Sequence, residues 1–162
     1  MKKCVAIAFI AWALAMTALG QRTPSFSQYP ARVEKARAKS INFKQPNNRT
    51  YKTRLSEALR GGVNFAGHYI IVGWGCGTGC TNAAVIDART GNVAWPIQFY
   101  NVDASYGDGY SDEQIEFRKN SRLMIIHGRP GSANENDQNK PGDYYYEWRN
   151  NSFRRLKFVE KK

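Results

Sequence analysis

Residues 50–60 repeat their apolar side chains at the spacing of one helix face. Tyr51, Leu55 and Leu59 recur every four residues, with polar and charged residues between them. The glycine pair at residues 61–62 then ends the pattern, because glycine favours helix termini. We therefore expect one short amphipathic helix here, packed over a sheet.

Beyond residue 62 the helical spacing disappears, and short runs of β-branched and aromatic residues follow. Turn-forming residues separate these runs, among them Gly91 and Asn120. The spacing of Ile97, Phe99 and Val102 is compatible with a third strand that continues past its proline. The predicted strands cover residues 68–74, 82–87, 92–96, 115–118, 123–128, 144–148 and 153–159.

About seven strands after one helix predict a mainly β fold. Its architecture is expected to be an antiparallel sandwich, a barrel or a strongly curled sheet. Hairpins are expected with turns at Gly91 and at residues 150–151. Residues 103–113 and 130–143 are rich in turn-forming and acidic residues, and we expect both to be surface loops.

The chain divides into three segments, and the first, residues 1–20, has the pattern of a signal peptide. Two lysines precede an uncharged apolar run of 15 residues, and the small residues Ala18 and Gly20 close it. Fifteen residues are short against the ~20 that cross a bilayer as a helix. We therefore expect cleavage after residue 20, no transmembrane span in the remaining chain, and a periplasmic or secreted protein.

The second segment, residues 21–49, is polar and basic, and prolines interrupt it three times. This composition predicts a loosely ordered basic arm with a helical turn near residues 33–38. The third segment, residues 50–162, is expected to form a single mostly β domain. Without residues 1–20 the chain has 142 residues, which suffice to bury a core as a monomer.

The positive charge of the chain narrows the choice of partners. The formal net charge is +11, and loss of the two lysines in residues 1–20 leaves +9. Such an excess favours anionic partners. Export argues against nucleic acid, which leaves an anionic component of the cell envelope or a protein partner. The arginines and lysines are spread along the chain, so a basic surface that only keeps the protein dissolved is an equally good interpretation.

Cys76 and Cys80 are the two cysteines that remain after cleavage, and an exported chain favours a disulfide between them. A bridge between residues so close in sequence requires the backbone to double back. The glycines at positions 75, 77 and 79 permit the dihedral angles that such a bend needs. We expect the bridge to shape a loop between two strands rather than to hold the whole fold.

A thiol-based redox or copper site is the alternative interpretation of the same cysteines. Soft thiolate ligands with a nearby histidine suit copper, and His68 is the candidate third ligand beside Cys76 and Cys80. Nucleophilic catalysis by Cys76, with His68 or His127 as its base, is a further possibility. An oxidised pair has no thiolate to attack with, so this last hypothesis conflicts with the disulfide.

The segment around the two cysteines is also the candidate binding loop. Tyrosines in a glycine-rich loop beside basic residues are typical of a surface that binds sugars or proteins. The candidate binding residues are Trp74, Gly75, Gly77, Thr78, Gly79, Tyr106 and Tyr110.

Three strings of the sequence resemble a family of uncharacterised exported bacterial proteins. Residues 64–69 read N-F-A-G-H-Y, residues 74–80 read W-G-C-G-T-G-C, and residues 86–91 read I-D-A-R-T-G. The family shares the pattern N-F-A-G-x-Y, W-G-C-G-x-x-C and D-x-x-T-G. The resemblance covers about residues 61–96, implies an exported domain and transfers no catalytic residue.

These observations predict an exported, non-enzymatic binding protein without a cofactor. Its partner is expected to be an anionic envelope component or a protein, as for an inhibitor. The redox or copper protein remains the competing hypothesis.

Overall fold

The computed structural model describes residues 22–103, 105–106, 109–110, 114–132 and 139–161. The predicted signal peptide lies outside these residues, as do parts of the two predicted surface loops. Within the described ranges, no helix has both the length and the apolar character that a membrane crossing requires.

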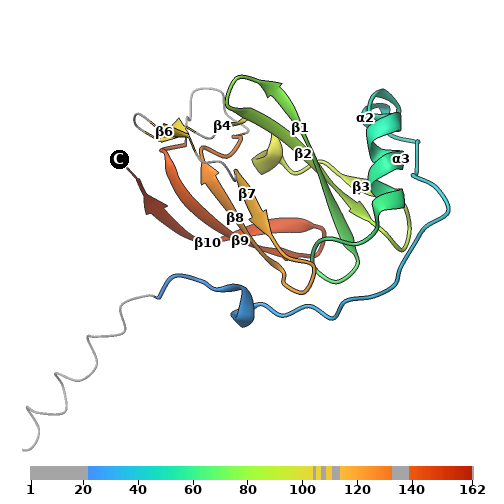
Figure 1. The fold of residues 1–162 in the computed structure, drawn as a ribbon, viewed down its shortest axis with the longest axis horizontal. Coiled ribbons are helices and arrows are strands. Elements are labelled where there is room, and N and C mark those ends of the chain that lie inside the picture. The colour runs from blue at the N-terminus through green and yellow to red at the C-terminus, as the bar shows by residue number, and fades with distance from the viewer. Residues whose placement is uncertain (1–21, 104, 107–108, 111–113, 133–138, 162) are drawn as a thin grey trace, which may run out of the picture.

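Two antiparallel sheets of four strands each face one another in a sandwich-like fold (Figure 1). The predicted mainly β class is therefore confirmed, and the sandwich is the architecture present. The first sheet contains β1 (Tyr69–Gly77), β2 (Cys80–Asp87), β3 (Val93–Ala94) and β4 (Val102–Asp103). The second contains β7 (Ile115–Phe117), β8 (Leu123–Gly128), β9 (Gly142–Arg149) and β10 (Ser152–Glu160).

The strand order follows the hairpins predicted from the turn residues. β1 pairs with β2 and β2 with β3, while β4 returns to pair with the other end of β2. The second sheet has the order β10-β9-β8-β7, and the turn between β9 and β10 contains Asn150 and Asn151 at positive φ. A two-stranded ribbon, β5 (Ser105–Tyr106) with β6 (Gly109–Tyr110), follows β4.

The main core lies between the two sheets, and the alternation of side chains along each strand places residues there. Ile71 of β1 and Val85 of β2 point inward against Met124 and Tyr146 of the second sheet. Their neighbours Ile70 and Ile86 point to the opposite face, as the period of two requires.

The outer face of the first sheet is covered by two helices, α2 (Pro46–Thr50) and α3 (Lys52–Gly61). Leu55 and Leu59 of α3 are buried against Ile70 and Ile86. The amphipathic helix predicted at residues 50–60 is thus present over the sheet. The fold has three layers on this side: helix, first sheet and second sheet.

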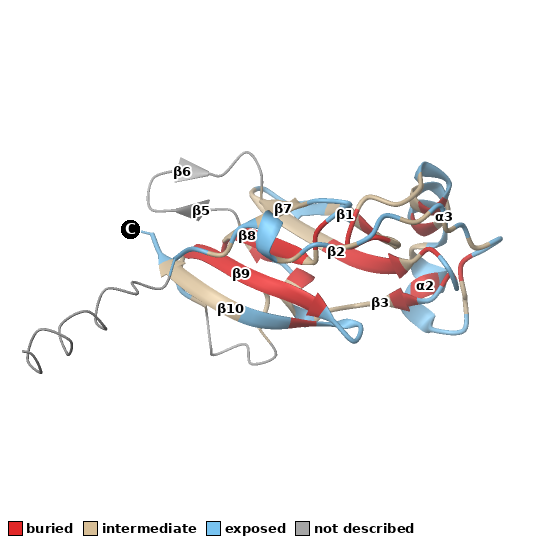
Figure 2. Ribbon diagram, turned by 90° about the horizontal axis from the view of Figure 1, so that it is seen from below, coloured by how far each residue is buried: buried red, intermediate tan, exposed pale blue. Residues whose placement is uncertain are grey.

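Strand β9 is buried along both faces, from Gly142 to Trp148 (Figure 2). Its inner face joins the main core. On its outer face Tyr145 packs with Leu123 and Ile125, and Phe26 and Tyr29 from the N-terminal segment cover this cluster. The N-terminal segment therefore contributes to the core of the second sheet.

Residues 31–45, which we call the strap, run across the sandwich as an extended segment (Figure 1). Backbone hydrogen bonds attach it to turns that lie far away in sequence: Glu34 N to Gly67 O (2.8 Å), Ala38 N to Ala88 O (2.6 Å) and Asn42 N to Gly91 O (2.8 Å). The sequence predicted a loosely ordered arm here instead, because its hydrogen-bond partners cannot be found from local composition.

Two local predictions are wrong. The helical turn expected near residues 33–38 is absent, since the strap is extended there, and a 3-10 turn lies earlier at η2 (Phe26–Gln28). The third strand does not continue past Pro96, because the chain enters another 3-10 turn, η3 (Ile97–Phe99). Proline lacks the backbone N–H that a strand pair would use, so β3 ends early at Ala94.

Candidate functional site

The β1–β2 hairpin ends in the disulfide that the sequence predicted. Cys76 and Cys80 are joined, with their Cα atoms 5.2 Å apart. The pairing of β1 with β2 shifts register between Gly75 and Gly77, and the chain turns through Thr78 and Gly79. Gly77 and Gly79 have φ of +147° and +67°, a region that favours glycine. The glycines therefore permit the bend that the bridge closes.

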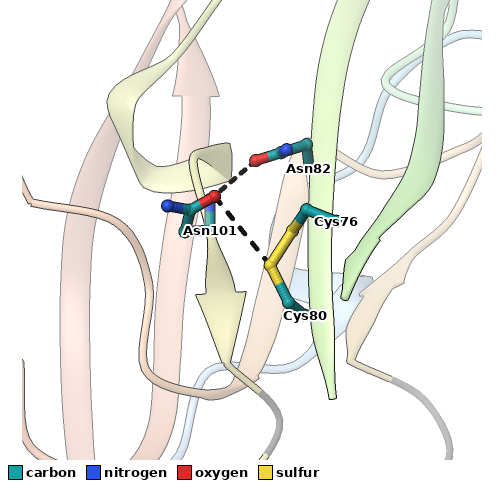
Figure 3. Close-up of a disulfide and its surroundings, with 4 residues drawn as sticks. All are labelled: Cys76, Cys80, Asn82 and Asn101. Carbon is teal, nitrogen blue, oxygen red and sulfur yellow. Dashed lines mark hydrogen bonds between the residues drawn. A yellow bond between two sulfur atoms is a disulfide. The ribbon is translucent and has the colours of Figure 1, made fainter. Parts of the chain in front are cut away.

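Two asparagines connect this tip to the segment before β4 (Figure 3). The backbone N–H of Asn101 donates to Asn82 Oδ1 at 2.7 Å. The Asn101 side-chain oxygen lies 3.9 Å from Cys80 Sγ. A disulfide sulfur carries no proton, so this second contact is a van der Waals contact. The connection places η3 and Tyr100 beside the hairpin.

A groove of about 290 Å³ opens beside this end of the first sheet. Its walls come from α2, the start of α3, β1, β2 and the segment through η3. Side chains from segments 47–51, 74, 82–83 and 95–100 thus meet in one place. The lining residues are Asn47, Tyr51, Trp74, Asn82, Ala83, Trp95, Pro96, Ile97, Phe99 and Tyr100.

Three half-buried aromatic rings form one wall of the groove. The ring of Tyr51 lies 4.6 Å from that of Trp74 and 5.4 Å from that of Trp95, measured between centroids. The two tryptophans contact each other edge to face at 5.9 Å. Tyr100 and Ile97 stand at the rim, with 61% and 42% of their surface exposed. Such partly open aromatic surface is typical of a binding site.

A buried amide holds Trp95 in place from behind. Trp95 Nε1 donates to Asn48 Oδ1 at 2.8 Å, and Asn48 Nδ2 donates to the Asn42 carbonyl at 2.6 Å. Asn48 is only 1% exposed. This network ties the indole ring to α2 and to the strap, so hydrogen bonds within the protein itself set the position of the ring.

The lining of the groove is aromatic, aliphatic and amide, and none of the described residues that line it is a carboxylate. Ring faces offer apolar contact, while the amides of Asn47 and Asn82 offer donors and acceptors. The site can therefore hold a small ring with an apolar face and a polar edge.

The surface next to the groove is strongly basic. Residues 31–60 contain nine arginines and lysines but only two acids, so this stretch carries +7 of the formal charge. The stretch forms the strap, which runs past the ends of the strands, and the helices α2 and α3, which lie on the outer face of the first sheet (Figure 1). The nine cations are Arg32, Lys35, Arg37, Lys39, Lys44, Arg49, Lys52, Arg54 and Arg60.

A second cavity, of about 490 Å³, lies between the strap and α3. Its polar lining comes from Arg37, Lys39, Arg60, Ser40 and Ser56, and no acid is among the described residues around it. The Arg37 guanidinium donates to the Arg60 carbonyl at the end of the helix. The cavity thus brings three cations and two hydroxyls together, which is a composition suited to an anion.

The remaining residues of the candidate binding loop are spread over two places. Gly75, Gly77 and Thr78 are exposed at the hairpin tip, and Gly79 is half-buried there. Tyr106 and Tyr110 belong to the β5–β6 ribbon, and their side chains lie outside the described part of the structure. Among the loop residues whose side chains the structure describes, Trp74 lines the groove and the three glycines and Thr78 do not.

His68 lies at the opposite end of β1 from the disulfide. Cys76 lies eight positions further along a nearly extended chain, which corresponds to about 26 Å at a rise of 3.3 Å per residue. Its ring packs on that of Tyr69 at 4.1 Å, and burial lowers its pKa. The structure does not bring His68 together with Cys76 and Cys80.

His127 also has a different environment from the one the nucleophile hypothesis needs. Its Nδ1 lies 2.8 Å from an Asp143 carboxylate oxygen, and its Nε2 lies 3.7 Å from Glu116. His127 and Asp143 are paired positions on β8 and β9, so the contact follows from strand register. Within the described ranges, no group of three or more histidine, cysteine or acidic side chains has the arrangement of a metal site.

Local sequence patterns did not reveal most of the groove. The sequence pattern indicates a helix residue at Tyr51 and a strand residue at Trp95, and Asn47, Asn82 and Tyr100 carry no motif. The basic face, in contrast, could have been found by summing charge over residues 31–60.

Comparison of the chain with protein-family models, curated proteins and solved structures finds no match.

Proposed function

We propose that this protein is an exported binding protein that holds an anionic partner of the cell envelope on its basic face. The basic face comprises the strap, α2 and α3, and the aromatic groove lies at its edge. Export is inferred from the pattern of residues 1–20, which has a basic start, an apolar run and small residues before the cleavage position.

The concentration of cations in residues 31–60 is the observation that carries the proposal. A stretch with a net charge of +7 on the surface of a small domain raises the repulsion among like charges. An oppositely charged partner relieves this repulsion and is attracted to the surface over about 10 Å at 0.1 M salt. The cavity lined by Arg37, Lys39 and Arg60 provides a place for one anionic group within this face.

Two charge-reversal variants with the same net charge test the proposal. Lys39→Glu with Arg54→Glu changes the basic face, at exposed positions of the strap and α3. Arg149→Glu with Arg155→Glu changes exposed positions of β9 and β10 in the second sheet. Both pairs of substitutions lower the formal charge equally. A difference in binding affinity between the two variants therefore depends on which surface is changed and not on the total charge.

The probes are polyphosphate, a sulfated heparin-type polysaccharide, polyglutamate and vesicles that contain phosphatidylglycerol. Titration calorimetry at 50 and 500 mM NaCl measures binding, with phosphatidylcholine vesicles as the uncharged control. We expect at least one anionic probe to bind, more than tenfold more weakly at 500 mM NaCl. We also expect the double variant at Lys39 and Arg54 to bind about tenfold more weakly. Each charge reversal removes an attraction on the order of 1 kcal/mol across about 8 Å of water, and salt reduces this attraction further.

Two outcomes contradict the proposal. The first is that no anionic probe binds at 50 mM NaCl. The second is that the control pair at β9 and β10 weakens binding as much as the pair on the basic face.

A further inference from the structure

We infer that the aromatic groove holds one sugar ring of an acidic saccharide, so that the anionic partner is a glycan bearing carboxylate or sulfate groups. This inference rests on the proposed function and names the ligand class of its site. Three features of the groove carry it: the aromatic wall, the amide edge and the position of the nearest cations.

The aromatic wall matches the apolar face of a sugar ring. A pyranose presents several C–H groups on one face, and these pack on the face of an aromatic ring. Tyr51, Trp74 and Trp95 are in mutual contact, and they line the cavity together. Trp95 is fixed through Asn48, so little conformational freedom is lost when a ligand packs on it.

The amide edge matches the hydroxyl groups of the same ring. Sugar hydroxyls both donate and accept hydrogen bonds, and a carboxamide offers both functions as well. Asn82 accepts from the Asn101 backbone through Oδ1, which leaves its Nδ2 group as a donor at the groove. Asn47 of α2 also lines the groove and is exposed. A purely apolar side chain of a protein partner would leave these amides without partners.

The size of the groove restricts it to a single ring. Small-molecule sites commonly occupy about 300–1,000 Å³, and the groove has about 290 Å³. The rest of a saccharide chain must therefore run over the neighbouring surface.

The neighbouring surface is the basic face, and α3 leads across it. Tyr51 at the start of α3 lines the groove, and Arg60 near its end lines the cationic cavity. The two residues are nine positions apart, which corresponds to about 14 Å along a helix. Arg49 and Lys52 flank Tyr51, and both are exposed. A short acidic saccharide with one ring in the groove would place its next charges along these cations.

An acidic peptide can pair with the cations of the basic face but has no ring with several hydroxyls to fill the groove. A neutral saccharide can fill the groove but forms no ion pairs with the basic face. An acidic saccharide can do both.

Four matched probes separate these possibilities in titration calorimetry at 50 mM NaCl. They are a galacturonate hexamer, its fully methyl-esterified form, a heparin-derived hexasaccharide and hexaglutamate. The methyl ester keeps the sugar and removes the charge, while hexaglutamate keeps the charge and removes the sugar. We expect one of the two acidic saccharides to bind at least tenfold more tightly than both the methyl ester and hexaglutamate.

Groove variants complete the test. We expect Trp74→Ala to weaken binding of the acidic saccharide at least tenfold and to leave polyphosphate binding unchanged. Because truncation of a half-buried tryptophan can lower stability, Tyr100→Ala is the second variant. Tyr100 is 61% exposed, so its removal leaves the fold intact, and we expect severalfold weaker saccharide binding.

The failures of the two proposals are distinguishable. If polyanions bind on the basic face but hexaglutamate equals or exceeds the saccharides, the partner is an acidic peptide and the inference is overturned. If saccharides bind equally well to Trp74→Ala and Tyr100→Ala, the groove does not hold the sugar. If no anionic probe binds the protein, the proposed function itself fails.

Discussion

Replacing Asn48 by alanine removes the buried amide that joins the strap, α2 and Trp95. Asn48 donates to the Asn42 carbonyl and accepts from Trp95 Nε1. Alanine can do neither, so one acceptor on the strap and one donor at the groove lose their partners. We predict a loss of stability together with a looser groove wall.

The two hydrogen bonds set the size of this loss. An orphaned buried polar group costs about 1–3 kcal/mol. Asn42 and Trp95 are half-buried, so water reaches part of each group and the lower half of that range applies. We expect the free energy of unfolding to fall by about 3 kcal/mol for the two groups together. For a chain of this length, that corresponds to a decrease in Tm of about 6–12 °C.

Urea denaturation followed by tryptophan fluorescence measures the change, with Asn47→Ala as the matched control. Asn47 is the preceding residue on the same helix but is exposed, so its replacement should change the free energy of unfolding by less than about 0.5 kcal/mol. Equal effects of the two substitutions would refute the reasoning, because burial and hydrogen bonding are what distinguish the two asparagines.

Two further predictions concern the disulfide and one buried carboxylate. Replacing Cys76 and Cys80 by serine should lower the free energy of unfolding by only about 2 kcal/mol, because a loop with a sequence separation of 4 loses little chain entropy on closure. A variant that is already unfolded at the start of a thermal denaturation experiment would contradict this expectation. A hydrogen bond from Arg154 holds the pKa of Glu147 below its ordinary value. The ionised carboxylate therefore stabilises the fold at pH values above its unfolded-state pKa, and this stabilisation is lost as the pH falls through the lower folded-state pKa. Urea midpoints measured from pH 7 to pH 3 should therefore decline less steeply for Glu147→Gln than for the natural protein, and parallel curves would count against the assignment.

The strands and the principal helix were predictable from the sequence, because their signals are local. Alternating apolar residues with turn residues between them located the hairpins, and the spacing of Tyr51, Leu55 and Leu59 located α3. The glycines around Cys76 and Cys80 likewise predicted a bend that a disulfide could close. In each case, the residues that decide the structure are neighbours in the chain.

The strap and η3 were not predictable in this way. Residues 31–45 have no hydrophobic period, and their position depends on carbonyl and amide groups at Gly67, Ala88 and Gly91. The alternation after Pro96 looked like a strand, but the chain turns there and forms a wall of the groove. Hydrogen-bond partners in distant segments set the position of the strap, whereas the missing N–H of Pro96 ends the strand pairing before η3.

The chain's own pattern was enough to establish a basic, mainly β domain with one helix and a bridged hairpin. It could not place Tyr51, Trp74, Trp95 and Asn82 around one groove, nor could it place His68 far from the cysteines. Those positions depend on strand pairing and on the packing of α3, which bring distant residues together or hold near ones apart. Composition and periodicity specify elements, whereas a binding site arises from the distances between elements, and only the folded chain has those distances.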